Sequence, residues 1–194
     1  MINYYDWAEY QSKMHANKIA ITDYSLKKKI SYKELNLSAC KIASFLKKRG
    51  IGHSDRVAIL SKNHSIFFEL QFACSKNGSI MVPLNWRLTA NELAYILDDC
   101  EPSLLIVDDC FEPIANQLRS MMPNIIIQFF NSDGKSNEFS ENIKDCPGDF
   151  KSVALSLDDL IMIMYTSGTT GHPKGAKINH KMQLFNAVNL SGIA

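Results

Sequence analysis

The residues with the clearest chemical signature form one short segment, Tyr165 to Gly175. Its eleven residues include four aliphatic hydroxyl side chains, three glycines and one lysine, Lys174. Glycines let the backbone approach a ligand closely and direct successive N–H groups at it. Hydroxyl groups donate hydrogen bonds to phosphate oxygens, and a lysine places a positive charge against a polyanion. The segment therefore predicts a loop that binds phosphate groups.

Other glycine-rich motifs fit this segment less well. The P-loop motif, Gly-x-x-x-x-Gly-Lys-[Ser/Thr], needs a wider spacing than that of Gly168 and Gly171. It also needs a hydroxyl after the lysine to hold magnesium, where this chain has Gly175. The dinucleotide fingerprint Gly-x-Gly-x-x-Gly is absent from the sequence. A surface turn that binds nothing stays as the structural alternative.

Short apolar runs and helical periods define the elements that must position this loop. Strands are predicted at residues 19–24, 56–60, 79–82, 104–107, 125–130, 160–165 and 176–179. Capping boxes at Ser31–Glu34 and Thr89–Glu92 predict the starts of two helices. Further helices are expected near Ser65, over residues 113–121 and from Lys181 onward.

The polar stretch 131–158 is predicted to be a long surface loop. Pro83 is expected to end the strand predicted at residues 79–82. Alternating strands and helices indicate an α/β fold with a largely parallel sheet flanked by helices. The strand that precedes the glycine-rich loop is then expected to direct it to the carboxyl edge of the sheet, where open α/β sheets bind ligands.

The composition is that of an ordinary globular domain. Of the 194 residues, 46 % are hydrophobic and 21 % are charged, and the net charge is +1. A disordered chain would have fewer apolar residues and a larger net charge. The balanced charge gives no reason to expect nucleic acid as a partner. The N-terminus has no signal-peptide pattern and no apolar run is long enough for a membrane span, so a cytoplasmic location is expected.

Metal-binding and disulfide patterns are weak. The five cysteines contain no Cys-x-x-Cys pair, and we expect them to be reduced and mostly buried. Adjacent carboxylates occur at residues 98–99, 108–109 and 158–159, but neighbouring side chains diverge on a helix or strand. We therefore expect solvated element ends at these pairs and no metal site.

Residues 165–175 resemble the signature loop of the adenylate-forming superfamily, which includes acyl-CoA and aryl-CoA ligases, firefly-type luciferases and peptide-synthetase adenylation domains. Further segments have family counterparts in the same order: Ser31–Leu35, Asp55–Ile59 with Asn63, Gly78–Leu88, Glu92–Leu93 and the strand at Leu104. The pair Thr169–Thr170 and the stretch Pro83–Leu88 are more similar to acyl-CoA ligases than to peptide-synthetase domains.

The resemblance implies that residues 1–194 are the N-terminal portion of the large domain, which binds ATP and the carboxylic acid. Besides ATP, the resemblance implies Mg²⁺ as a cofactor and coenzyme A as a co-substrate. It also implies which residues bind the phosphates of ATP: Thr166, Ser167, Gly168, Thr169, Thr170, Gly171 and Lys174.

Three other polar residues have plainer explanations. His172 falls at a variable family position and is expected to be a solvated loop residue. His180 follows the loop, and a helix-capping or packing role is expected for it as much as a functional one. Arg87 is expected to make a structural hydrogen bond or ion pair rather than to bind phosphate.

Relatives need parts that lie beyond Ala194: a later Glu that helps to hold magnesium, an Asp for the ribose, and a small C-terminal domain that brings a catalytic lysine. We therefore expect no catalytic residue in this chain, no activity of the chain alone, and association through exposed apolar surface.

Three alternatives stay open for the function. The chain could belong to an adenylation domain that loads a carrier protein. It could also be a non-catalytic nucleotide-binding or interaction remnant, or a structural domain whose loop binds nothing. The acid that is activated and the oligomeric state are not encoded in these residues.

Overall fold

The computed structural model describes residues 5–24, 26–133, 137–166 and 172–191. The strands are β1 Ile19–Asp23, β2 Lys28–Ser31, β3 Arg56–Leu60, β4 Ile80–Leu84, β5 Leu104–Asp108, β6 Ile127–Phe130, β7 Leu160–Thr166 and β8 Lys174–Asn179. The helices are α1 Trp7–Met14, α2 Tyr32–Lys48, α3 Ile66–Asn77, α4 Ala90–Cys100, α5 Glu112–Met121, α6 Glu138–Lys144 and α7 His180–Ser191, with a 3₁₀ turn at Asp109–Phe111.

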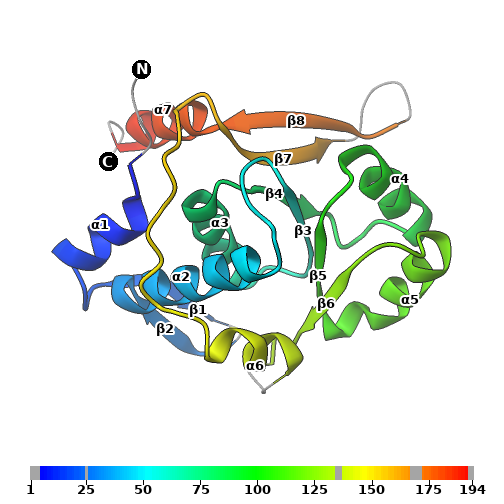
Figure 1. Cartoon of the computed structure of the whole chain (residues 1–194), viewed down its shortest axis with the longest axis horizontal. Coiled ribbons are helices and arrows are strands. Elements are labelled where there is room, and N and C mark those ends of the chain that lie inside the picture. The colour runs from blue at the N-terminus through cyan, green and yellow to red at the C-terminus, as the bar shows by residue number, and fades with distance from the viewer. Residues whose placement is uncertain (1–4, 25, 134–136, 167–171, 192–194) are drawn as a thin grey trace.

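A six-stranded sheet forms the centre of the described part of the chain, in the order β6-β5-β3-β4-β7-β8 (Figure 1). Its strands are parallel except for β8, which runs antiparallel to β7. The strands β1 and β2 form a separate antiparallel hairpin. The predicted α/β fold with a largely parallel sheet is confirmed.

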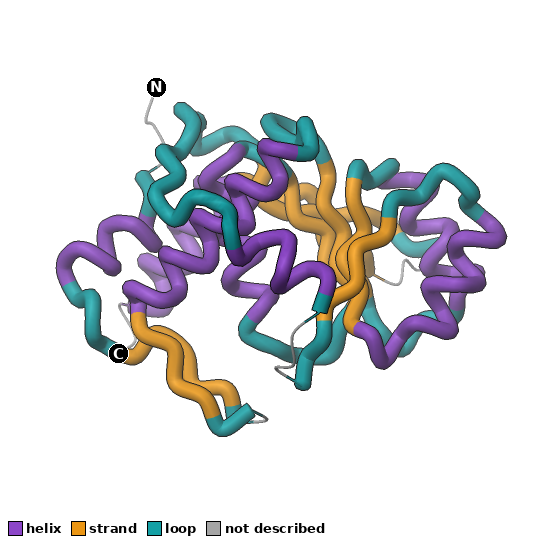
Figure 2. The backbone as a smooth tube through the Cα atoms, turned by 60° about the horizontal axis from the view of Figure 1, so that its bottom comes forward, coloured by secondary structure: helices purple, strands orange, loops and turns teal. Residues whose placement is uncertain are grey.

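Successive residues of each central strand face opposite helical layers, because side chains alternate across a strand. Val57 and Ile59 of β3 join the core formed with α2 and α3, whereas Ala58 and Leu60 join the core formed with α4 and α5. Figure 2 shows the strands between these two groups of helices. Burial on both faces explains why the strands read as continuous apolar runs.

Both predicted capping boxes are present. The Ser31 hydroxyl accepts from the Glu34 amide, and the Glu34 carboxylate accepts from the Ser31 amide at 2.8 Å. Thr89 and Glu92 make the same reciprocal pair at the start of α4. At the end of α3, Gly78 adopts φ +82°, a left-handed conformation that glycine reaches without strain.

Two sequence-based expectations were wrong. Residues 131–158 are not only loop, because they contain α6, which Asn137 caps and whose Phe139 is buried in the core. The strand β4 does not stop before Pro83 but continues to Leu84. The register between β4 and β7 consists of the Met81–Met162 pair, so Pro83 has no register partner on β7. On that side Pro83 lies as in an edge strand, where the backbone N–H that proline lacks is not needed for pairing.

The helix α1 was not predicted. It begins where Asp6 accepts a hydrogen bond from the Glu9 amide, so an N-cap signal was present in the sequence. Its apolar period was too short to be recognised.

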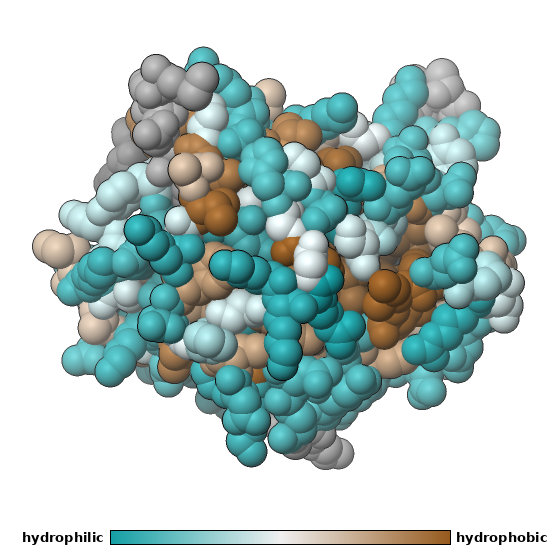
Figure 3. Space-filling model, in the orientation of Figure 1, coloured by the Kyte–Doolittle hydropathy of each residue, from teal (hydrophilic) through white to brown (hydrophobic). Residues whose placement is uncertain are grey.

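The surface carries apolar side chains in places. Figure 3 shows brown areas between the mostly polar side chains of one face. On α7, the exposed large apolar side chains are Met182, Phe185, Val188 and Leu190. None of the helices in the described ranges has the length and apolarity to cross a membrane; the cytoplasmic location stays a prediction.

Candidate functional site

The glycine-rich loop connects two paired strands at the carboxyl edge of the sheet. β7 is parallel to β4, so its last residue, Thr166, lies at the edge where β3, β4 and β5 also end. β8 begins at Lys174, which is the register partner of Thr166. The two described residues of the predicted phosphate-binding set therefore lie opposite each other at the base of the loop, and both are exposed. The other predicted members, Ser167, Gly168, Thr169, Thr170 and Gly171, lie outside the described residues.

Helix α4 holds both sides of the loop base. The Tyr165 hydroxyl donates a hydrogen bond to the Asp99 carboxylate. On the other side, the His172 ring stacks on the Tyr95 ring, with centroids 5.0 Å apart and planes at 25°. Tyr95 and Asp99 are four residues apart and therefore share one face of α4. His172 is exposed, as expected, but it is also packed against an aromatic ring.

Gly175 makes room for the Tyr165 ring. These two residues are register partners across β7 and β8. A Cβ atom on Gly175 would lie 2.9 Å from the Ile163 Cγ2 atom, closer than real Cβ contacts allow, and 3.1 Å from the Tyr165 Cζ atom, tighter than most of them. The glycine therefore has a role in packing beside the loop.

The phenol of Tyr165 stays protonated. Burial raises its pKa, and the hydrogen bond to the Asp99 carboxylate raises it further. Both causes disfavour the phenolate, the first by desolvation and the second by negative charge. Tyr165 can therefore act as a fixed hydrogen-bond donor to α4 and not as a base.

A groove of about 470 Å³ opens beside the loop base. Its walls come from the residues after β4, from α4, from the end of β7 and from the two residues before β8; among the lining residues are Asn85, Glu92, Tyr95, Tyr165, Thr166 and Pro173. The groove is thus continuous with the residues at which the predicted phosphate-binding loop begins and ends.

Two basic residues follow other strands that end at the same edge. Lys62 comes after β3 and Arg87 after β4. Both lie over the Trp86 ring, the Arg87 guanidinium at 4.3 Å and the Lys62 ammonium at 5.5 Å from its centroid. Arg87 was expected to form a structural hydrogen bond or ion pair. Among the described residues no ion pair involves it, and its guanidinium instead makes a cation–π contact.

The adjacent carboxylates have separate structural partners. Asp99 binds Tyr165, and Asp159 accepts from the Ser156 amide at 2.7 Å. Asp108 is only 2 % exposed and accepts a hydrogen bond from Ser132 at 3.0 Å, so the expectation of a solvated element end was wrong for it. Within the described ranges, no group of three or more His, Cys, Asp or Glu side chains could hold a metal ion.

Sequence reasoning missed the contribution of α4. Nothing in the residue types of Tyr95 and Asp99 indicated a contact with a loop 70 residues later. The sequence showed only that Tyr95 and Asp99 are four residues apart on a predicted helix. The crossing of α4 over the hairpin depends on sheet order, which the sequence did not specify.

Comparison with known proteins identifies the family of the chain. The family model described as AMP-binding enzyme matches residues 8–194. The chain is 34 % identical over 152 residues to the fatty acid–[acyl-carrier-protein] ligase ScoC of Streptomyces coeruleorubidus, covering 78 % of this chain and 28 % of that protein. It is 31 % identical over 186 residues to the indoleacetate–CoA ligase of Aromatoleum aromaticum, covering 95 % of this chain and 36 % of the relative.

Solved structures give the same result. The structure of ATP-bound MatB from Rhodopseudomonas palustris superposes with a TM-score of 0.80 at 28 % identity, over 94 % of this chain and 37 % of that one. The chain thus spans about a third of the length of these relatives. A family match over almost all of its residues, together with a loop placed at the carboxyl edge of the expected sheet, shows that this chain belongs to the AMP-binding enzyme family, the adenylate-forming ligases.

Proposed function

We propose that this chain is the ATP-phosphate-binding part of an AMP-forming acyl-CoA ligase. In the first half-reaction, the carboxylate of an acid attacks the α-phosphate of ATP, which gives acyl-AMP and releases pyrophosphate. In the second, the thiol of coenzyme A attacks the acyl carbon and AMP leaves. The single observation that supports this most is the position of Thr166 and Lys174, paired across the hairpin at the base of the loop.

The residues of this chain would act by binding and orienting the phosphates. The exposed Lys174 ammonium and Thr166 hydroxyl flank the loop, where they meet the β- and γ-phosphates. Ser167, Gly168, Thr169, Thr170 and Gly171 would complete the set by hydroxyl and backbone N–H donors. Tyr165 and His172, held by α4, fix where the loop begins and ends. Such preorganised charge and donors stabilise transferring phosphate groups.

The reaction with ATP also requires magnesium. The described residues contain no cluster of carboxylates and histidines suited to it, so they do not fit a protein-held metal site. In proteins that use ATP, Mg²⁺ is commonly bound through one or two carboxylates together with the substrate phosphates. We propose that it reaches this chain with the phosphates of ATP.

The acceptor thiol distinguishes two proposals. One relative is named as a ligase for an acyl-carrier protein and another as a CoA ligase. The first makes the loading of a carrier protein a specific second candidate. The resemblance of residues 83–88 and of Thr169–Thr170 to acyl-CoA ligases favours coenzyme A.

The test is product analysis with the protein that carries this segment. It is incubated with MgATP, a panel of fatty and aromatic acids and either coenzyme A or a phosphopantetheinylated carrier protein. Acid-dependent AMP and an acyl-CoA thioester are expected. Acid-dependent AMP with a thioester only on the carrier would favour the second candidate. Release of ADP, or no acid dependence, would overturn both.

The 194-residue chain by itself is proposed to bind MgATP without forming AMP, and to associate through the apolar side chains of α7. If the longer protein that carries this segment also binds MgATP without forming AMP, the result would favour the non-catalytic nucleotide-binding remnant instead. Detectable acyl-AMP from the short chain would contradict the proposed inactivity.

A further inference from the structure

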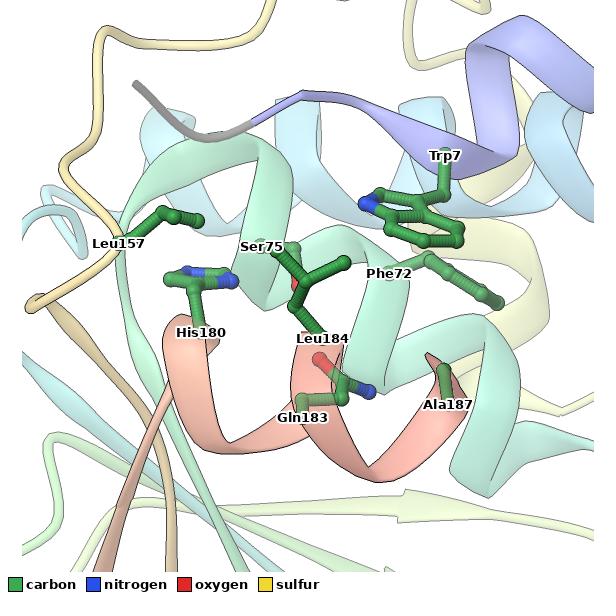
Figure 4. A pocket seen from close by; sticks show the side chains of 8 residues that line it. All are labelled: Trp7, Phe72, Ser75, Leu157, His180, Gln183, Leu184 and Ala187. Carbon is green, nitrogen blue, oxygen red and sulfur yellow. The ribbon is translucent and has the colours of Figure 1, made fainter. Parts of the chain in front are cut away.

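A second pocket lies between the first and last helices, away from the loop. It has a volume of about 130 Å³ and is bounded by α1, α3, α7 and the segment before β7. Figure 4 shows Trp7 and Phe72 on one side and Leu157 and Leu184 on others, with their side chains directed at the enclosed space. The pocket is therefore walled mainly by apolar and aromatic side chains from four separate segments.

The polar groups of the pocket are uncharged at neutral pH. They belong to Trp7, Ser75, His180 and Gln183. Burial lowers the pKa of His180 to about 4, against a smaller opposing effect of the Asp159 carboxylate. His180 is therefore neutral at pH 7, and none of the lining residues is a lysine, arginine, aspartate or glutamate. An ion in this pocket would lose hydration without gaining a counter-charge.

The pocket lies at the opposite end of the β7–β8 hairpin from the loop. Thr166 and Lys174 are partners at the loop end, whereas Leu160 and Asn179 are partners at the other end, directly before His180. Six residues of strand span about 20 Å at about 3.3 Å per residue. A small molecule in this pocket therefore does not touch a phosphate held by the loop.

The walls from α1 and α3 are held together by a buried ion pair. The Lys76 ammonium lies 2.7 Å from the Asp6 carboxylate, and these residues are the chain neighbours of Ser75 and Trp7. The Asp6 carboxylate also accepts from the Glu9 amide at the start of α1. Two of the three helices around the pocket are thus fixed to one another independently of α7.

We propose that this pocket binds a small uncharged molecule, or the uncharged end of a larger one, at a site separate from the nucleotide loop. The ligand class is a single aromatic ring or short alkyl group with one hydroxyl or amide, which would pair with Ser75 or Gln183. An apolar cavity of about 150 Å³ is known to hold one benzene molecule, so this pocket of about 130 Å³ takes about one six-membered ring.

The probe for the test is 4-fluorophenol, titrated into the chain and followed by ¹⁹F NMR. A saturable shift with a Kd on the order of 1 mM is expected for a ligand of this size. Ala187→Leu, which places a larger side chain in the pocket, should weaken binding about tenfold or more. Asn186→Leu adds the same side chain to the same helix at an exposed position that does not line the pocket, and it should leave the Kd within about twofold.

A second measurement does not depend on the filling variant. The chain has two tryptophans, so a Trp86→Phe background reports Trp7 alone. Its fluorescence should change with the same Kd. The anion 4-fluorobenzoate should bind at least about tenfold more weakly than 4-fluorophenol, and saturating MgATP should not change the 4-fluorophenol Kd.

Several results would overturn the proposal. They are the absence of a saturable shift or fluorescence change, an Ala187→Leu variant that is folded by circular dichroism and binds as the wild type does, or tighter binding of the benzoate. Competition by MgATP would also overturn it, by placing the probe at the nucleotide site. The proposed ligase function does not depend on these outcomes, because its test reads AMP and thioester products.

Discussion

The Lys76 ammonium lies 2.7 Å from the Asp6 carboxylate, and the two side chains are 1 % and 9 % exposed. The pair joins α1 to α3 across 70 residues of sequence. The same carboxylate accepts a hydrogen bond from Ser152, in the long segment before β7, and from the Glu9 amide. One buried carboxylate therefore connects the N-terminal helix to two other parts of the fold.

Removing both partners of this pair should destabilise the fold by less than the sum of the two single removals. Lys76→Met leaves the Asp6 carboxylate buried without its counter-charge. Asp6→Asn likewise leaves the Lys76 ammonium buried without a counter-charge. Each should lower the free energy of unfolding by about 3 kcal/mol. The double variant should lose at least about 1 kcal/mol less than the sum of the two. Urea denaturation of all four proteins measures this coupling.

The exposed pair Lys13–Glu9 on α1 is the matched control. Lys13→Met should change the unfolding free energy far less than Lys76→Met, because solvent screens an exposed pair. Additive effects of the two buried substitutions would contradict a direct interaction between Asp6 and Lys76.

The same pair predicts a dependence of stability on acid. Burial opposes ionisation of Asp6, but hydrogen bonds from Lys76, Ser152 and the Glu9 amide together hold its pKa below the ordinary value. A carboxyl group with a depressed folded-state pKa stabilises the fold above its unfolded pKa of about 3.9 and ceases to do so as pH falls through the folded value. The stability difference between wild type and Asp6→Asn should therefore be constant above about pH 5 and shrink below about pH 4. A difference that grows in acid would have the wrong sign.

Contacts from α4 should strengthen nucleotide binding without touching the nucleotide. Tyr165→Phe and Asp99→Asn each weaken the hydrogen bond that fixes the end of β7 at the loop. We expect MgATP affinity, measured by calorimetry, to fall about three- to tenfold for each, which corresponds to about 1 kcal/mol for a hydrogen bond to a charged group. Asp98→Asn removes a neighbouring exposed carboxylate of α4 and should have no effect of this size. A double variant no weaker than Tyr165→Phe alone is expected, because both changes break one bond.

The fold was largely readable from the sequence because local signals agreed with it. The capping residues Ser31 and Thr89 marked element boundaries by local chemistry. Contacts between distant residues left no such mark. The pairing of Lys76 with Asp6 and of Tyr165 with Asp99 depends on which helix crosses which strand. The loop was recognised from its composition, whereas the residues that hold it in place were not.

Gly175 should be sensitive to the smallest substitution. In Gly175→Ala the new Cβ would lie 2.9 Å from the Ile163 Cγ2 atom and 3.1 Å from the Tyr165 ring, so the Ile163 methyl group and the Tyr165 ring, which is bonded to Asp99, must give way. We expect a loss of about 1–2 kcal/mol in unfolding free energy, together with weaker MgATP binding. Gly52→Ala is the control, since a Cβ there meets nothing within 4 Å. Equal effects of the two substitutions would show that crowding beside Tyr165 is not the cause.

Lys174 should contribute to nucleotide affinity through its charge. Lys174→Ala removes an exposed ammonium at the base of the loop, and MgATP affinity is expected to fall about tenfold or more, in line with a charge-assisted contact. Lys177→Ala removes an equally exposed ammonium of β8 farther from the loop and should change affinity less than about twofold. Because the lost interaction is electrostatic, added salt should reduce the difference between wild type and Lys174→Ala. Equal losses in the two variants would point to general attraction by the surface.

His180 should make stability fall between pH 6.5 and pH 4. It is 3 % exposed, and burial lowers its pKa to about 4. In the unfolded chain a histidine binds a proton near pH 6.5, so the unfolded state takes up more protons as pH falls through this range. The stabilisation is therefore complete above about pH 6.5 and decreases by about 3 kcal/mol toward pH 4. In urea denaturation, His180→Asn should remove this part of the pH dependence, and His15→Asn, at an exposed position, should retain it. If wild type and His180→Asn lose stability in parallel across this range, the buried ring is not the group that titrates.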